Sequence, residues 1–193
     1  MVVATPNPIE IHTAEDLADL PSSERYELIR GRYIDMAPPG GEHGYVTSQL
    51  AALVTVFVRG EGLGYTFTAE TGFIVARDPD TVLAPDFAFI TKVRLTGPVP
   101  QAYVTVIPDL VLETRSPSDR EREVALKVER WLQAGVRMVW DLDPKRRVLV
   151  VHRATGLPQI WGANDTLQGD DVLPGFTVAL HDILPDEATG SVT

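Results

Sequence analysis

The sequence predicts an α/β protein in which a mixed β-sheet is flanked by helices. Apolar residues recur at helical spacing in two segments, and short apolar runs typical of strands lie between and after them. The order of residues 109–115, 119–134 and 137–142 is strand, helix, strand, which favours a parallel pair joined by a crossover helix. The 193 residues, 44% of them apolar and 23% charged, suit a single domain. We expect residues 1–193 to form one domain, with an ordered core at about 12–187 and short loose ends.

Three helices are expected. Residues 13–20 begin with a threonine that can cap a helix, followed by acids and spaced leucines. Residues 43–58 carry apolar side chains at spacings of three and four, and glycines follow them. Ser118 and Glu121 form a capping-box pair that predicts the start of the helix at about 119–134, which also ends before a glycine.

The remaining apolar runs are expected to be strands. They are two short strands in 26–36, strands at about 64–76, 85–91, 109–115, 137–142 and 147–153, and an edge strand with a short turn in 173–184. The predicted sheet is therefore mixed, with the 109–115 and 137–142 strands parallel.

Composition and charge exclude several classes of protein. The formal net charge of −10 argues against strong non-specific binding of the free protein to DNA. The chain has no cysteine, which excludes disulfides and thiolate zinc sites, and we expect a cytoplasmic protein. No apolar run reaches 18 residues and no secretory signal is evident, so no membrane association is expected.

Two acids stand out in the predicted strands. Glu113 follows the apolar run 110–112, and a buried strand rarely carries an acid without a partner. Strand alternation puts Asp86 on the same side as Ala88, and Glu113 on the same side as Val111. If the two strands are neighbours, both carboxylates can face the same side of the sheet. Carboxylates brought close repel each other unless a cation lies between them, and oxygen ligands of this kind suit Mg²⁺ or Mn²⁺. The Thr114 carbonyl can add a further ligand.

Lys127 follows on the next predicted helix, at the border of its apolar stripe. From there its amine can reach the mouth between the strands and steady a phosphate charge. Each of these residues also has a plainer explanation. Asp86 can simply start a strand after Pro85, Glu113 can pair internally with Arg115 or Lys127, and Lys127 can be an exposed side chain.

Several segments together resemble one known family. The residues PD at 85–86, ETRSPS at 113–118, Lys127 and WDLDP at 140–144 are similar to the Uma2 family of putative restriction endonucleases, within the PD-(D/E)xK nuclease superfamily. The resemblance extends from about Tyr26 to Leu184 and includes YELIRGRYIDMAPPGGEH at 26–43 and LPGFTV at 173–178. It implies a restriction-endonuclease-like mixed sheet flanked by helices.

The resemblance also implies roles for individual residues. Asp86 resembles the first metal-binding acid of the family, Glu113 the second, and Lys127 the lysine of the superfamily moved to the following helix. The common pattern has lysine two residues after the second acid, where this chain has Arg115. Arginine can bind phosphate but cannot act as a base, so Arg115 either shares the role of Lys127, replaces it, or pairs with Glu113.

His43 and Glu27 match the family pattern in position, with less defined roles. His43 resembles a histidine at the start of the first long helix, although a helix-start residue is the plainer interpretation. Glu27 lies near an acid of the pattern and can instead pair with Arg25 or Arg32.

The resulting hypothesis is a Mg²⁺-dependent (or Mn²⁺-dependent) endonuclease that acts on DNA as a homodimer. Two alternatives stay open. One is a catalytically inactive nuclease-fold module that binds nucleic acid or another partner, with Arg115 as the symptom of lost cleavage. The other is a metal-independent hydrolase of a small phosphorylated or glycosidic substrate, with the two acids as an acid–base pair.

Overall fold

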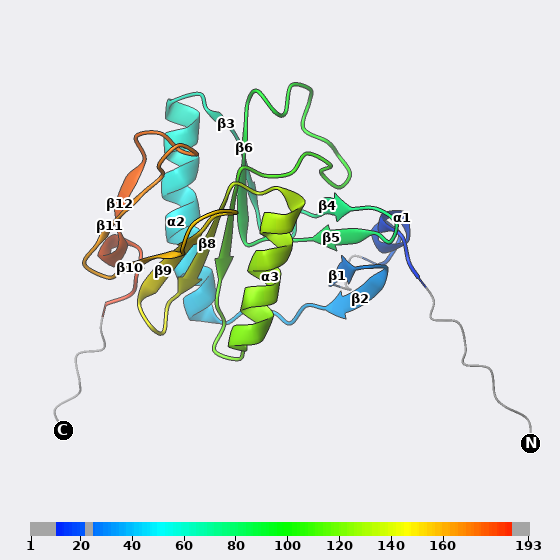
Figure 1. Ribbon diagram of the computed structural model, residues 1–193, viewed down its shortest axis with the longest axis horizontal. Coiled ribbons are helices and arrows are strands. Elements are labelled where there is room, and N and C mark those ends of the chain that lie inside the picture. The colour runs from blue at the N-terminus through cyan, green and yellow to red at the C-terminus, as the bar shows by residue number, and fades with distance from the viewer. Residues whose placement is uncertain (1–10, 22–24, 187–193) are drawn as a thin grey trace, which may run out of the picture.

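A six-stranded sheet forms the centre of the molecule in the computed structural model, which describes residues 11–21 and 25–186. The strand order is β10-β9-β8-β7-β6-β3 (Figure 1). The strands are β3 (Gly64–Thr68), β6 (Phe87–Thr91), β7 (Leu110–Thr114), β8 (Met138–Asp143), β9 (Val148–His152) and β10 (Gln159–Gly162). Among these six strands only β7 and β8 run parallel to each other, and α3 (Glu121–Ala134) connects them. The predicted mixed sheet and its crossover are thus confirmed.

The two long helices cover opposite faces of this sheet. On one face α2 (Gly41–Gly60) packs through Val46, Leu50, Val54 and Val58 against a cluster that includes Phe87, Phe89, Leu110 and Leu112. On the other face α3 packs through Val128 and Trp131 against Ala88, Ile90, Val111 and Val139. The alternation predicted for the β6 and β7 strands is therefore confirmed, because their odd and even positions belong to different clusters.

A second sheet of four strands lies beside the first, with the order β2-β1-β5-β4 (Figure 1). Its strands are β1 (Tyr26–Ile29), β2 (Arg32–Asp35), β4 (Phe73–Ala76) and β5 (Thr81–Leu83), and α1 (Ala14–Ala18) packs on β1. The expectation of one strand over residues 64–76 is wrong, because a turn with Glu70 at φ 73° separates β3 from β4 and sends them to different sheets. β5 was not predicted.

The chain ends with a small two-stranded sheet of β11 (Thr166–Gln168) and β12 (Thr177–Ala179), followed by the 3₁₀ turn η1 (Leu180–Asp182). Leu167, Val178 and Leu180 bury this unit against the α2 face of the core. The strand and turn expected in 173–184 are confirmed, whereas β10 and β11 were not predicted. The loose ends expected at the first ten and last six residues lie outside the described residues.

The helix caps agree with the sequence at α1 but not at α3. Thr13 caps α1 as expected, and it forms a capping box with Asp16. The capping box predicted for Ser118 and Glu121 is wrong: the N-cap is Arg120, and no side chain caps it. Asp119 instead accepts a hydrogen bond from the Ser116 amide at 2.7 Å. The polar side chain before α3 therefore stabilises the preceding turn and does not cap the helix.

None of the helices in the described part of the chain has the length and apolar character that crossing a membrane requires.

Candidate functional site

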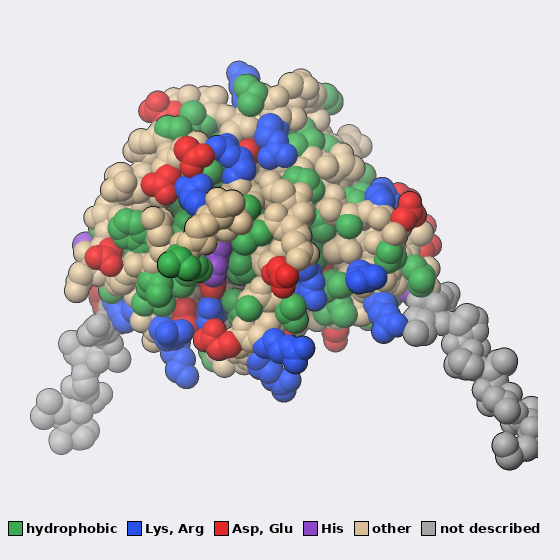
Figure 2. Space-filling model, in the orientation of Figure 1, with side chains coloured by type: hydrophobic (Ala, Val, Ile, Leu, Met, Phe, Trp, Pro, Cys, Tyr) green, Lys and Arg blue, Asp and Glu red, His purple; other side chains and the backbone are tan. Residues whose placement is uncertain are grey.

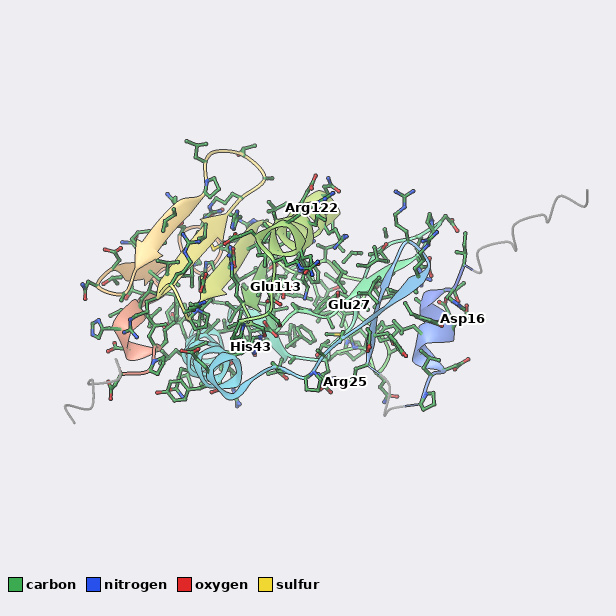
Figure 3. The ribbon with its side chains drawn as sticks, turned by 90° about the horizontal axis from the view of Figure 1, so that it is seen from below. Asp16, Arg25, Glu27, His43, Glu113 and Arg122 are labelled. Carbon is green, nitrogen blue, oxygen red and sulfur yellow. The ribbon has the colours of Figure 1, made fainter. Side chains whose placement is uncertain are left out.

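A pocket of about 460 Å³ lies at the ends of β6 and β7, between α2 and α3. The linker before α2, the β3–β4 turn and the residue before β1 complete its walls. Among the predicted site residues, those that line it are His43, Asp86, Glu113, Thr114, Arg115 and Lys127. Figure 3 shows Glu27, His43 and Glu113 together in the middle of the molecule, whereas Asp16 and Arg122 lie toward its periphery.

Asp86 is held by the neighbouring strand. It directly precedes β6, whose antiparallel pairing of Phe87 with Leu112 brings this residue beside the end of β7. The Thr114 amide donates a hydrogen bond of 2.7 Å to Asp86 Oδ2, and His43 Nε2 lies 3.1 Å from the same oxygen. These two contacts hold the Asp86 carboxylate at the pocket. A residue that only begins a strand after Pro85 does not need them.

Glu113 is buried, and two side chains of α3 donate to its carboxylate. Lys127 Nζ lies 2.8 Å from Oε2, and the Trp131 indole Nε1 donates to Oε1 at 2.7 Å. Burial raises the pKa of Glu113 to about 8, with Lys127 opposing this rise and Asp86 adding to it. Asp86 and Glu113 thus act on each other electrostatically across the pocket.

Lys127 connects Glu113 to Glu27. Its Nζ lies 3.3 Å from Glu27 Oε1, which also accepts a hydrogen bond of 3.0 Å from the Ala84 amide. Burial opposes the charged form of Lys127, but Glu113 and Glu27 outweigh burial and raise the lysine pKa. Lys127 is thus not a mere surface side chain.

The partners suggested for Glu27 in its plainer interpretation are wrong, because Arg25 instead pairs with Glu70 at 2.6 Å. Arg32 lies on β2, and the carboxylate of Glu27 is directed to Lys127 and Ala84.

His43 lies in the first turn of α2, and its side chain is only 9% exposed. Burial lowers its pKa, but the hydrogen bond and charge of Asp86 outweigh burial and raise the His43 pKa above its ordinary value. Its Nδ1 atom is buried without a hydrogen-bond partner among the described residues. The imidazole is therefore held at the pocket through Nε2 and its contact with Asp86.

Thr114 and Arg115 take up different positions at the end of β7. The Thr114 hydroxyl accepts a hydrogen bond of 2.8 Å from Thr47 on α2, and the role of its carbonyl as a ligand stays a prediction. Arg115 donates two hydrogen bonds to Asp141, at 2.7 and 2.6 Å, and a third to Glu121. The suggested pair of Arg115 with Glu113 is therefore wrong.

The sequence analysis did not assign Trp131 to the site. The residue is fully buried, and its indole nitrogen faces Glu113. A signal was present: Trp131 follows Lys127 by four residues, so the two side chains share one face of α3.

The site offers two carboxylates to a cation, and within residues 11–21 and 25–186 no three or more Asp, Glu or His side chains gather as a metal-binding group. A ready-made cage of the kind Zn²⁺ or Ca²⁺ occupies is therefore not formed by the described residues. Mg²⁺ commonly takes one or two carboxylates together with water and substrate phosphate, and Asp86 and Glu113 fit that requirement.

The fold and this pocket define a class, that of mixed α/β proteins with acids at the ends of adjacent strands. A crystal structure described as a putative nuclease from Anabaena variabilis ATCC 29413 has a similar fold, with a TM-score of 0.74 and 19% sequence identity. The match covers 89% of this chain and 96% of that one. A search of curated proteins gave no match.

The model of the Uma2 family, described as putative restriction endonuclease, matches residues 14–181, and the chain belongs to this family. The resemblance stated from the sequence and the predicted fold class are thus confirmed.

Proposed function

We propose that this chain is a Mg²⁺-dependent (or Mn²⁺-dependent) endonuclease that hydrolyses phosphodiester bonds of DNA. The observation that carries this proposal is the convergence of Asp86 and Glu113, from neighbouring strands, with Lys127 in a single pocket. The family description and that of the structural neighbour support the same class of reaction.

Asp86 and Glu113 would hold the cation, because each carboxylate keeps lone pairs beyond those that its protein donors use. The Thr114 carbonyl would be a further ligand. When bound there, the cation supplies charge neutralisation at the scissile phosphate and activates a water molecule.

The protein side chains divide the remaining tasks. Lys127 stays protonated because its pKa is raised, so it stabilises negative charge that develops on the phosphate and does not act as the base. Glu27 positions Lys127, and His43 positions Asp86. Arg115 is engaged by Asp141, which leaves the function of the superfamily lysine to Lys127.

Hydrolysis assays test the proposal directly. Wild-type protein, Asp86→Asn, Glu113→Gln and Lys127→Met would be incubated with end-labelled DNA in Mg²⁺, in Mn²⁺ or in EDTA. We expect hydrolysis only with the cations, and a loss of about 100-fold or more in each variant. Asp170→Asn is the matched control, since Asp170 pairs with Arg153 outside the pocket.

Two results would contradict the proposal: hydrolysis that survives EDTA, or full activity of Asp86→Asn. Calorimetric titration of wild-type protein and Asp86→Ala with Mn²⁺ separates an enzyme from an inactive binding module. Folded wild-type protein that neither binds the cation nor cleaves DNA supports the binding module.

The homodimer and the cytoplasmic location belong to this proposal as well. The homodimer rests on analogy with nucleases that act as two copies of one site.

A further inference from the structure

Building on the proposed function, we infer that the pocket takes an unpaired strand of nucleic acid and not an intact duplex. Three features of the described structure support this: the depth of the acids, the size and lining of the pocket, and the charge around it.

The acids are recessed. The side chain of Glu113 is 10% exposed and that of Asp86 20%, while His43 beside them is 9% exposed. A scissile phosphate must therefore pass the walls of the pocket before it reaches either carboxylate. The phosphates of a duplex lie on a stiff rod that bends only at a cost in free energy, whereas a single strand can enter a confined site.

The pocket has the dimensions and lining of a site for one small ligand. Its volume of about 460 Å³ falls within the range of pockets that enclose small molecules and cofactors. Much of its wall is apolar, formed by Met36, Ala37, Pro39, Ala51, Pro85 and Val124. Enzymes that act on an unstacked nucleotide bury its base against side chains of this kind.

The charge around the pocket does not suit a long duplex. Glu70, Asp119, Glu123 and Asp141 line it in addition to Asp86 and Glu113, and they outnumber its basic side chains. On the face that Figure 2 shows, basic and acidic side chains are interspersed and no broad area has one sign. Duplex binding normally draws on many phosphate contacts with lysine and arginine.

Arg25 is placed to contact a strand at the edge of the pocket. Its side chain is 36% exposed and pairs with Glu70, which is itself 65% exposed, and both line the pocket. An exposed pair of this kind is weak, so Arg25 can exchange Glu70 for a phosphate of the entering strand.

The test compares three DNA substrates of one sequence: a single strand, a fully paired duplex, and a duplex with an unpaired tail. Wild-type protein with Mg²⁺ or Mn²⁺ should cleave the single strand and the tail at least about tenfold faster than paired DNA, with the cuts mapping to unpaired nucleotides. Equal or faster cleavage of the paired duplex would overturn the inference while leaving the proposed function intact.

If none of the three substrates is cleaved, the proposed nuclease function is contradicted, but the preference for an unpaired strand can still be tested by binding. Fluorescence anisotropy would then compare labelled single-stranded and duplex oligonucleotides. Preference for the single strand supports the inference, and equal affinity, preference for the duplex or no binding overturns it.

A pair of variants tests the route into the pocket. Ala37 is exposed and lines the pocket, whereas Ala52 is exposed on α2 and does not. The indole of Ala37→Trp takes up space inside the pocket, so we expect this variant to weaken binding or cleavage of the single strand about tenfold or more, and Ala52→Trp to leave both unchanged. The same response from both variants would overturn the assignment of this pocket.

Discussion

A single buried carboxyl group, that of Glu113, connects packing with the chemistry of the site. Each of its oxygens has a donor from α3, the Lys127 amine on one and the Trp131 indole on the other. Both contacts fix the direction of the carboxylate, because neither oxygen can turn without losing a hydrogen bond. Trp131 is thus a positioning residue for Glu113.

Replacing Trp131 by phenylalanine tests this role. Trp131→Phe keeps an aromatic ring in the core but leaves Glu113 Oε1 without its donor. We expect it to destabilise the fold by about 1–3 kcal/mol beyond the loss in packing, and to weaken Mn²⁺ affinity about 10-fold to 100-fold. Urea unfolding and calorimetric titration measure the two effects.

The matched control is Trp140→Phe. Trp140 is as deeply buried as Trp131, but its Nε1 has no hydrogen-bond partner among the described residues. If both substitutions lower Mn²⁺ affinity equally, the indole of Trp131 has no special relation to Glu113.

For single residues, the sequence predicted which side chains lie at the site better than it predicted which side chains pair with one another. Alternation and helical spacing brought Asp86, Glu113 and Lys127 to one place, and the structure agrees. The partners of Glu27 and Arg115 were not predictable in the same way. A long side chain can reach several neighbours, and which one it meets depends on how the second sheet and β8 are placed.

Among the elements, the parallel pair β7 and β8 is tied at its end by Arg115 and Asp141. Both side chains are well buried, with exposed fractions of 15% and 2%. Burial raises the pKa of Asp141, but the hydrogen bonds and charge of Arg115 together with the contribution of His152 outweigh burial and hold this pKa below its ordinary value of 3.8. This interaction therefore stabilises the folded state above that pH and is lost as the pH falls through the lowered pKa.

The substitution Asp141→Asn should remove the contribution of this side chain to the loss of folding stability at low pH. It removes the most deeply buried charged partner of Arg115, which keeps its contacts with Glu121 and Asp143, so we expect the free energy of unfolding at pH 7 to fall by about 3 kcal/mol. Below pH 4 the difference from wild type should shrink. Unfolding by urea between pH 2 and 7 measures both, and Asp182→Asn, at a side chain 61% exposed, is the control. A constant difference across this range would contradict the assignment.

Long periodic elements were predictable from the sequence, whereas the short strands β5, β10 and β11 were not. The two long helices and the strands β7 and β8 carry enough apolar positions to define a period. β5 and β11 have three residues each, too few for alternation to be recognised. The single strand expected over residues 64–76 is wrong because the apolar pattern continues across the turn at Glu70. The chain passes from the six-stranded to the four-stranded sheet at this turn.

For the whole molecule, Lys127 joins the two sheets. It lies on α3 between Glu27 of the four-stranded sheet and Glu113 of the six-stranded one. Removing its charge leaves two buried carboxyl groups without their shared cation. In that state burial still raises the pKa of Glu113, so the folded protein favours the protonated acid.

Lys127→Met should therefore make stability depend on pH. A folded-state pKa above the unfolded value of 4.5 gives a contribution that is present at low pH and lost as the pH rises. We expect the variant to be close to wild type at pH 5 and about 3 kcal/mol less stable at pH 9. Urea unfolding across this range measures it, with Lys145→Met, at an exposed position, as the control. Equal destabilisation at both pH values would argue against this linkage.

The hydrogen bond from the Thr114 amide to Asp86 comes from the main chain, which every residue type except proline possesses. Substitutions at position 114 can thus alter the shape of the surroundings while the first acid keeps its anchor. Ligand preference can thus change at this position while the geometry of the Asp86 carboxylate is kept. A library that places every residue except proline at position 114 would vary the ligand preference with little effect on Asp86.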